Sequence, residues 1–495
     1  MKKIGKYLVI ATGIIALTSC NFLKKEYTTL TYSQFDYATL YNGLTPSIGD
    51  VNLLIVPIEF SDKDSFTEEQ LNNINYSFNG NKEDNSNDYW ESLKSYYHKS
   101  SYGKLNFNCT ISDVFTPSFS SSLFVAKENA NLDYFETGTH VLAEEVYNNA
   151  TINSKPIDYK NFDSNKDGYV DGVWFIFNAG TTYEVFNLRY YWAYTSWMMN
   201  TKADINKPTF STFANCSQIF LYEAEESNGQ DAHTIIHETG HMMGLDDYYT
   251  YDKNVHFSSS GGKMMMDNNI GDHDAFSKFA LGWITPKLVT KEEEISLKSF
   301  GKSGDALIIS SDFVGNAFDE YLIIEFYTPD LLNEKDAITP YNEVLKNNMF
   351  KEPGIIVYHV DARIAHINLS SDGDGSTYFY VSNDISKFKK SNISIKDNYI
   401  TGEYYSIAAS NSKSKKLGEN AYFLIEQINK NNISFYNKSL ANDDSLYHKG
   451  DTFDSSSLFS FFSNSTFHNK KKINFNFTVL DINQEEAKLK FNKIW

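Results

Sequence analysis

Hydrophobic and polar positions in the first half of the chain follow both extended and helical periods. Residues 51–60, VNLLIVPIEF, form an apolar and largely β-branched run that predicts a buried strand, and Pro57 within it indicates a bulge or an edge. Helical and extended patterns follow one another after this run, over residues 88–99, 104–114, 139–149 and 170–177. This order predicts an α/β or α+β domain over residues 51–286, and we expect α+β with a mixed sheet.

Short extended patterns replace the helical ones over residues 287–495. Strands are predicted over residues 321–326, 354–360, 422–426, 473–480 and 487–491. Stretches rich in Asn, Ser and Lys separate them, and the most prominent, 386–420, is interpreted as a loop. Short strands at this spacing predict a β-rich C-terminal domain, expected to be a β-sandwich.

The beginning of the chain has the pattern of an export signal. Three lysines precede an apolar stretch over residues 7–17, which is too short to cross a bilayer comfortably. The LTSC at residues 17–20 resembles the lipobox of bacterial lipoproteins, in which the cysteine is lipidated and becomes the mature N-terminus. We expect a signal peptide over 1–19 and lipidation of Cys20, with an ordinary secretory signal and an incidental cysteine as the alternative.

Residues 20–50 are polar, with scattered tyrosines and no clear periodicity. They are expected to be a tether between the lipid anchor and the folded body. The protein is accordingly expected on the extracellular face of the bacterial cell membrane, anchored by lipid. No later stretch is long and apolar enough for a transmembrane helix.

Charge and cysteine content narrow the classes of protein further. With 63 Asp and Glu against 44 Lys and Arg, the formal net charge is −19. This argues against a nucleic-acid partner, because such binding depends on Lys and Arg neutralising phosphates. Only Cys109 and Cys216 remain beside Cys20, which excludes a disulfide-stapled scaffold; the sequence leaves open whether these two pair.

The chemistry of the chain is concentrated in residues 231–247, DAHTIIHETGHMMGLDD. On a helix, His237 and His241 share one face about one turn apart and can bind a single Zn²⁺. Glu238 would sit beside the metal, where it can take a proton from metal-bound water for attack on a peptide bond. An HExxH pattern also arises by chance on ordinary amphipathic helices, so the interpretation depends on a third ligand.

Asp247 is predicted to be that third zinc ligand. Gly244, three residues past His241, can adopt a left-handed conformation that ends the helix and reverses the chain. The adjacent Asp246 competes, but the spacing favours Asp247 and gives HExxHxxGxxD, which resembles the metzincin signature with Asp in place of the third His. Met266, in the methionine cluster that follows, is expected to form the Met-turn below the metal.

Several segments resemble the immune inhibitor A-like metallopeptidases of bacteria, a family of metzincin-type zinc endopeptidases. They are NLLIVPIEF at 52–60, SYGKLNF at 101–107, FDSNKDGYVDGVWFIFNAG at 162–180, HETGHMMGLDDYY at 237–249, MMDNNIGDHDAFSKFALGWI at 265–284, YLIIEF at 321–326 and GIIVYHVD at 354–361. The resemblance implies a secreted or surface zinc endopeptidase that uses the three ligands and the base named above. Asp246 departs from the Pro more usual in the family, and the short stretch before Val51 leaves little room for an inhibitory pro-segment.

A second metal is expected at residues 163–171, DSNKDGYVD, where oxygen-bearing side chains alternate and a glycine follows the third, as in a Ca²⁺ loop. The expected ligands are Asp163, Asn165, Asp167, the carbonyl of Tyr169, and Asp171. Trp174 occupies the position of the bidentate Glu, so the loop is not an EF-hand. A solvated Asx turn before a strand is the alternative.

Other histidines and tyrosines near the motif receive structural roles. His233 is expected at the surface rather than on the metal. His273 is expected to make a structural hydrogen bond, with an approach to the substrate as the alternative. Tyr248 and Tyr249 are expected to pack in the core, with stabilisation of a tetrahedral oxyanion as the alternative for either hydroxyl.

These features predict a zinc-dependent endopeptidase that hydrolyses protein or peptide substrates outside the cell. The alternative is a surface adhesion or binding lipoprotein whose metalloprotease-like domain is weakly active or inactive; the intact Glu238 disfavours it. A solute-binding lipoprotein would explain the anchor and leave the zinc pattern as a coincidence. The sequence predicts neither the physiological substrate nor the oligomeric state.

Overall fold

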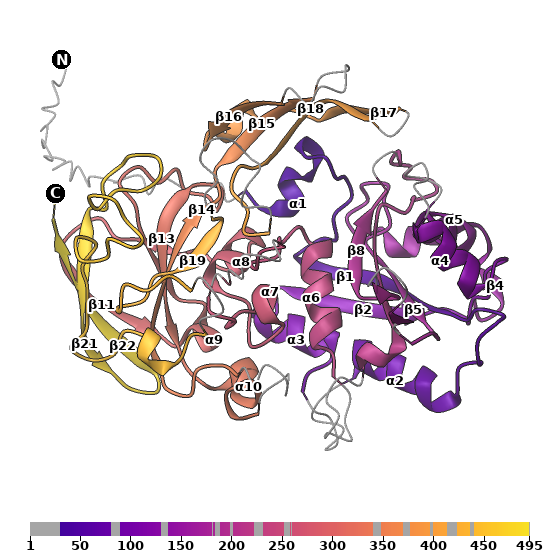
Figure 1. Cartoon of the computed structure of the whole chain (residues 1–495), viewed down its shortest axis with the longest axis horizontal. Helices are drawn as coiled ribbons and strands as arrows, with labels where there is room; N and C mark the ends of the chain where they lie inside the picture. The colour runs from indigo at the N-terminus through magenta and orange to yellow at the C-terminus, as the bar shows by residue number, and fades with distance from the viewer. Residues whose placement is uncertain are drawn as a thin grey trace, which may run out of the picture.

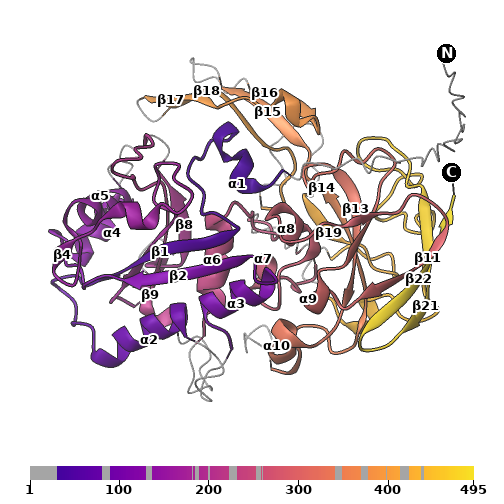
Figure 2. The same ribbon diagram turned by 180° about the vertical axis from the view of Figure 1, so that it is seen from behind.

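The computed structural model describes residues 30–80, 90–129, 137–180, 182–183, 189–198, 201–221, 231–251, 258, 260–339, 348–369, 377–396, 399–412, 423–435 and 440–494. The signal peptide expected over 1–19 and the lipidated Cys20 lie outside these residues. Among the described helices, none is long and apolar enough to cross a membrane. Figure 1 shows a helix-covered sheet beside a body made mainly of strands, and Figure 2 shows the same arrangement from behind.

A five-stranded sheet forms the centre of the first half of the chain. Its strands, in spatial order, are β2 (Leu105–Ile111), β1 (Gly49–Ile58), β5 (Val173–Phe177), β9 (Thr212–Ser217) and β8 (Tyr194–Trp197). The first four are parallel, and β8 is an antiparallel edge strand. The expected mixed sheet is therefore present.

Helices cover both faces of this sheet. One face packs against α2 (Glu68–Asn79), α3 (Leu93–Ser100) and α6 (His233–Met242). The other packs against α4 (Ser121–Asn129) and α5 (Gly138–Asn149). This burial on both sides explains why β1 is a continuous apolar run rather than an alternating one.

Pro57 does not mark an edge, contrary to the sequence prediction. It lies in β1, the second strand of the sheet, and pairs in regular register with Ile176 of β5. The carbonyls of Ile55 and Pro57 accept hydrogen bonds from the amides of Ser112 and Phe115, in the segment that follows β2. In a parallel sheet the N–H and C=O of one residue point to the same side, so the N–H that Pro57 lacks would also face β2. Since β2 ends at Ile111, a proline is tolerated there without loss of a ladder bond.

Two further sheets form the β-sandwich expected in the second half. The inner sheet contains β10 (Lys287–Leu288), β12 (Ala306–Ile309), β13 (Glu320–Tyr327), β14 (Gly354–Asp361) and β19 (Ile425–Gln427). The outer sheet contains β11 (Glu293–Lys298), β22 (Glu486–Lys493), β21 (Phe475–Ile482) and β20 (Thr452–Phe453). Apolar side chains from both sheets form one hydrophobic core between them.

The inner sheet also packs against the first half of the molecule. Successive residues of β13 point to opposite sides: Ile323 joins the core around α6, whereas Ile324 joins the core of the sandwich. The boundary expected at residue 286 is thus a connection in the chain, and a single hydrophobic core extends across it.

A four-stranded sheet occupies much of the region expected to be a loop. It has the order β16 (Thr377–Ser382), β15 (Ile364–Leu369), β18 (Tyr399–Ile407), β17 (Asn392–Lys396). The interpretation of 386–420 as a loop is therefore wrong for β17 and β18. Their polar residues are accommodated because the sheet lies at the surface over α1, as Figure 1 shows.

The expected tether over 20–50 is folded from residue 30 onward. Helix α1 (Tyr32–Phe35) and a short 3₁₀ turn (Asp36–Ala38) precede β1. Tyr32, Phe35 and Leu44 are buried in the main core, and the amide of Thr45 donates to the carbonyl of Met242. The interpretation as a tether is therefore wrong for residues 30–50, and residues 20–29 lie outside the described residues.

The remaining short elements connect these layers. They are α7 (Met265–Asn268), α8 (Ala275–Ala280), α9 (Phe300–Ser303), α10 (Glu334–Ile338), the pair β3 (Thr151–Ile152) and β4 (Lys155–Pro156), and the pair β6 (Thr182–Tyr183) and β7 (Arg189–Tyr190).

Cys109 and Cys216 are buried and do not form a disulfide with each other.

Candidate metal centre

Helix α6 carries the two histidines of the motif through the main hydrophobic core. Ile235, Ile236 and Met242 are buried there, and the helix ends at Met242. Gly244 has a φ of 104°, in the left-handed region, and the amide of Leu245 donates to the carbonyl of Gly240. The chain therefore reverses directly after the helix, as the glycine spacing predicts.

This reversal brings the three predicted ligands together. Nε2 of His237 lies 3.0 Å from Oδ1 of Asp247 and 3.1 Å from Nε2 of His241, and the His241 nitrogen lies 3.2 Å from the same oxygen. Ligand atoms about 2.0–2.1 Å from a tetrahedral Zn²⁺ would be separated by about 3.3 Å. The three side chains thus form a group that could hold a metal ion.

The hydrogen bonds of the two imidazoles determine where their protons are. Nδ1 of His237 lies 2.9 Å from the carbonyl oxygen of Met265, and Nδ1 of His241 lies 2.8 Å from that of Leu245. Because a carbonyl oxygen can only accept, each Nδ1 is the donor and each neutral ring has its lone pair on Nε2. Two lone pairs and a carboxylate oxygen therefore point at one position, which favours a cation there.

The charges of this group favour a cation in the same way. Burial lowers the pKa of His241, but the neighbouring Asp247 carboxylate outweighs this effect. In the metal-free protein the pKa of His241 is therefore raised to about 10. Burial opposes ionisation of Asp247, yet the two imidazoles hold the pKa of its carboxyl well below the usual value. Asp247 is therefore an anion, as a metal ligand must be.

Asp246, the competing candidate, is turned away from the histidines. Its carboxylate accepts hydrogen bonds from the hydroxyls of Ser410 at 2.8 Å and Ser412 at 3.2 Å, and from the amide of Asp247 at 3.0 Å. Asp246 thus fastens the ligand turn to a segment from the far end of the chain. The sequence preference for Asp247 as the ligand agrees with this geometry.

Glu238 lies beside the two histidines and faces strand β8. The hydroxyl of Thr195 in β8 donates to the Glu238 carboxylate at 3.1 Å and to its backbone carbonyl at 2.9 Å. Burial raises the pKa of Glu238, while the neighbouring histidines act in the opposite direction. A carboxylate with a raised pKa is a better proton acceptor, so this position suits a general base.

Met266 packs against helix α6 at Gly240, the residue before His241. A Cβ added at Gly240 would be 2.7 Å from the Met266 sulfur, so the methionine approaches this closely because residue 240 has no side chain. The carbonyl of Met266 also accepts a hydrogen bond from the amide of Tyr248 at 2.8 Å. The residue expected in the Met-turn therefore supports both the helix and the segment after the third ligand.

Tyr251 belongs to the site, although the sequence motif does not indicate it. Its hydroxyl donates a hydrogen bond to Oδ2 of Asp247, the oxygen that does not face the histidines. Tyr248 is a core residue, as expected, and its hydroxyl contacts Ser277. Burial and the nearby Asp247 carboxylate raise the pKa of Tyr249 above its usual value, so that hydroxyl keeps its proton.

His233 is fully buried, and the prediction of a surface position is wrong. Its ring lies between Asp231 and Asp336 and stacks on Trp90 with centroids 3.7 Å apart. Burial lowers the pKa of His233, but the two carboxylates outweigh this effect and raise the pKa to about 10. The ring is therefore a buried cation. Asp336 lies 103 residues away in the sequence, which explains why no local pattern indicates the pair.

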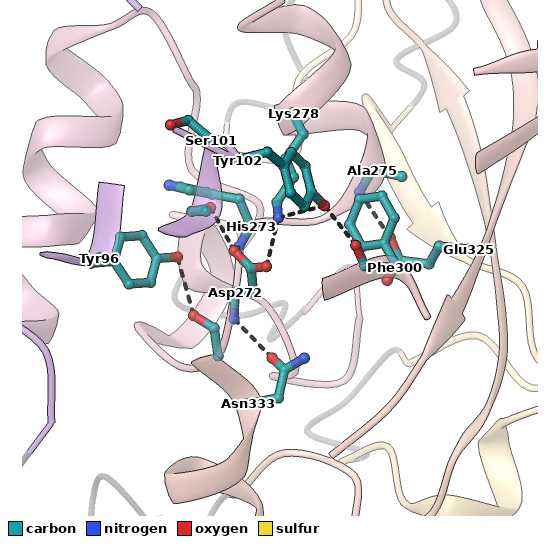
Figure 3. Close-up of polar contacts among 12 residues, drawn as sticks. Tyr96, Ser101, Tyr102, Asp272, His273, Ala275, Lys278, Phe300, Glu325 and Asn333 are labelled. Carbon is teal, nitrogen blue, oxygen red and sulfur yellow. Dashed lines mark hydrogen bonds and ion pairs between the residues drawn. The ribbon is translucent and has the colours of Figure 1, made fainter. Parts of the chain in front are cut away.

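The segment after Met266 forms a second buried polar network, shown in Figure 3. The ammonium of Lys278 donates to Asp272 at 2.6 Å and to the Tyr102 hydroxyl at 3.1 Å, and Glu325 of β13 accepts from the amide of Ala275 at 2.9 Å. A cavity of about 20 Å³, enough for one water molecule, lies among these residues. The network fixes the floor of the site to the inner sheet.

His273 is buried next to this network, but the hydrogen bond expected for it is absent. Neither ring nitrogen has a hydrogen-bond partner among the described residues. The ring packs instead against Tyr96, Tyr97 and Trp283, and burial holds its pKa well below the usual value. His273 is therefore a neutral aromatic residue of the core.

The expected calcium loop is folded as a set of internal turns. The Asp163 carboxylate accepts from the amides of Asp167 and Gly168, and Asp171 binds both the amide and the hydroxyl of Ser164. Within the described part of the chain, Asp163, Asp167 and Asp171 do not bring three carboxylate oxygens together at one position, as a metal site of these side chains would. This geometry, with Asn165 and Tyr169 bonded to Asp167, contains the Asx turns of the alternative, and calcium binding by this loop stays a prediction.

Comparison with family models and with curated proteins finds no match to this chain. The function is therefore argued from the site itself.

Proposed function

We propose that the protein is a zinc-dependent endopeptidase of the metzincin type, with His237, His241 and Asp247 as zinc ligands and Glu238 as general base. The observation that carries this proposal is the convergence of three electron-rich atoms within 3.2 Å of one another, with both imidazole protons bound to carbonyls on the other side. A cation resolves their mutual repulsion, and two imidazoles with one carboxylate suit zinc.

Three protein ligands leave a coordination position open, which is typical of catalytic rather than structural zinc. A bound Zn²⁺ would lower the pKa of a coordinated water and polarise a peptide carbonyl. Glu238, held by Thr195, accepts the proton that the water loses and returns it to the leaving amine. Thr195 positions the carboxylate and has no other role in this scheme.

Strand β8 supports peptide rather than small-molecule substrates. It is the edge strand of its sheet, it is half-buried, and it contains the threonine that contacts Glu238. An extended peptide can add to such an edge through main-chain hydrogen bonds, which places an internal peptide bond beside the base. An endopeptidase is favoured because an extended substrate can run past the site in both directions.

The arrangement of elements also supports a metzincin-type catalytic domain. A mixed sheet with an antiparallel edge strand, a zinc helix ending at glycine, a third ligand after the turn and a methionine below the helix occur in the expected order. The segments that resemble immune inhibitor A-like metallopeptidases include the two histidines, the glycine, the third ligand and the methionine. Export and lipidation at Cys20 complete the proposal, with extracellular proteins or peptides as substrates.

The test uses the full-length chain, kept in detergent, with a mixed peptide library read by mass spectrometry. We expect cleavage by the wild type, loss of cleavage with a chelator, and recovery with Zn²⁺. Glu238→Gln is expected to reduce the rate by about 10²–10⁴-fold, the usual contribution of a general base. Glu69→Gln, in the first turn of α2, is the control and keeps the wild-type rate.

Zinc content separates the peptidase from the alternative of a binding protein. If the wild type binds zinc stoichiometrically but leaves the library intact, the adhesion or binding lipoprotein is the better conclusion. Cleavage that persists in Glu238→Gln would show that another group is the base.

A further inference from the structure

A second group of metal-type side chains lies inside the β-sandwich, away from the motif on α6. It consists of Glu320 in β13, His359 in β14 and His468 in the segment before β21. His359 pairs with Leu322 across the two strands, and Leu322 belongs to the sandwich core, so this group is on the face of the inner sheet that meets the outer sheet. It is therefore separated from the candidate catalytic centre by the inner sheet.

The distances in this group resemble those of the first one. Oε1 of Glu320 lies 3.0 Å from Nε2 of His359 and 3.7 Å from Nδ1 of His468, and the two imidazole centroids are 4.7 Å apart. The two distances from the Glu320 oxygen lie on either side of the roughly 3.3 Å expected between ligands of a tetrahedral Zn²⁺. A further carboxylate oxygen, Oδ2 of Asp361, is 3.1 Å from Nδ1 of His468.

The charges around this group also favour a cation. Glu320 and Asp361 are buried carboxylates, and Glu426 lies directly opposite His359 in the neighbouring strand. The opposing positive charge is the guanidinium of Arg363, which binds Asp361 through two hydrogen bonds of 2.7 and 2.8 Å and lies 3.5 Å from Oε2 of Glu320, the oxygen that does not face His359.

We propose that Glu320, His359 and His468 bind a second zinc-class divalent cation, with Asp361 as the nearest additional oxygen ligand. Its role is structural. Glu320 and His359 come from the inner sheet, whereas His468 belongs to the segment leading into the outer sheet. The amides of His468 and Asn469 already donate to the Glu320 carboxylate at 2.5 and 2.8 Å, so a cation would reinforce a contact that joins the two sheets.

The test measures zinc bound to the full-length chain after dialysis, in a variant without the first site. Wild-type protein is expected to bind about two zinc ions per chain, and the double variant His237→Ala/His241→Ala about one. Adding His468→Gln is expected to remove the remaining ion; this side chain is partly exposed, so the substitution is tolerated by the fold. His366→Ala, which removes an unrelated histidine of β15, keeps it.

A spectroscopic measurement supports the assignment independently of variant stability. Co²⁺ added to the double variant is expected to give the visible absorption of a four-coordinate site, and His468→Gln to abolish it. Bound zinc is also expected to raise the unfolding temperature of the double variant. A double variant that binds no zinc, or that still binds it after His468→Gln, would overturn the proposal and leave the group as a metal-free network of ion pairs.

Discussion

Tyr251 extends the candidate metal centre beyond the motif that the sequence displays. It occupies the Asp247 oxygen that faces away from the histidines, and so fixes the orientation of the carboxylate. Partners of this kind usually determine how tightly ligands hold a metal, because they restrict the ligand before the metal binds. A tyrosine four residues after an aspartate is too common a spacing to be recognised from sequence alone.

Tyr251→Phe is therefore expected to weaken zinc binding about 10–100-fold without loss of fold. The measurement is competition with a chromophoric chelator, performed on the full-length protein. Tyr37→Phe, an exposed tyrosine in the N-terminal segment, is the control. Unchanged affinity in Tyr251→Phe would show that the hydrogen bond to Asp247 does not affect the metal.

Zinc affinity is expected to increase with pH. Because Asp247 raises the pKa of His241 to about 10, the metal-free imidazole is protonated below that pH, and zinc must displace the proton. Release of one proton per zinc makes the apparent affinity rise about tenfold per pH unit below pH 10. Chelator competition at several pH values measures this slope, and a flat profile would contradict the assigned protonation.

At the scale of elements, His233 connects the start of helix α6 with helix α10. The ring is a buried cation between Asp231, just before α6, and Asp336 in α10. Asp336 also accepts the amide of Gly271 at 2.7 Å, close to the floor of the site. One carboxylate therefore fixes both the helix that carries the ligands and the segment that follows the Met-turn.

Asp336→Asn is expected to lower the free energy of unfolding by about 3–5 kcal/mol, because it leaves a buried charge partly unpaired. The control is Asp384→Asn, an exposed residue in a weak 3.9 Å ion pair. Urea unfolding followed by tryptophan fluorescence measures both. An equal effect in the two variants would exclude a special role for the buried pair.

The pH dependence of the same pair follows from the raised pKa of His233. The folded value of about 10 exceeds the ordinary histidine pKa of 6.5, so the contribution of His233 to stability is complete below about pH 6.5. That contribution declines as the pH rises to about 10. In Asp336→Asn, the loss of stability over this pH range is expected to be smaller than in the wild type.

The sequence predicts elements well where one local pattern decides them. The helices α3 and α5, the strands β1, β2, β5, β13 and β14, and the turn at Gly244 all follow from spacing within a few residues. Polar strands such as β17 are missed because their pairing, not their composition, makes them strands. The burial of His233 and the role of Tyr251 are missed because their hydrogen-bond partners are brought together only by the folded chain. The fold of residues 30–50 is missed because a polar segment can still bury its few aromatic side chains.

At the scale of the whole molecule, the inner sheet belongs to two cores at once. Its β13 residues alternate between the core around α6 and the core of the sandwich. A sheet shared in this way links the stability of the first half of the molecule to that of the C-terminal half. The two halves should accordingly unfold together.

Ile323→Ala, on the side of β13 that packs into the core around α6, is expected to lower the free energy of unfolding by about 2–5 kcal/mol. Ile324→Ala, its neighbour on the sandwich side, is expected to have an effect of the same size. In both variants, zinc release and tryptophan fluorescence should change at the same urea concentration. Separate transitions would show that the halves unfold independently.

The bonds from Asp246 to Ser410 and Ser412 have a consequence for biosynthesis. The ligand turn is fastened by hydroxyls that are added to the growing chain 164 and 166 residues later. Asn411, between them, also donates to the carbonyl of Tyr248 at 3.0 Å. A nascent chain that has emerged only as far as residue 247 thus lacks the side chains that fasten its ligand turn, and we expect this turn to become fixed only after residue 412 has emerged.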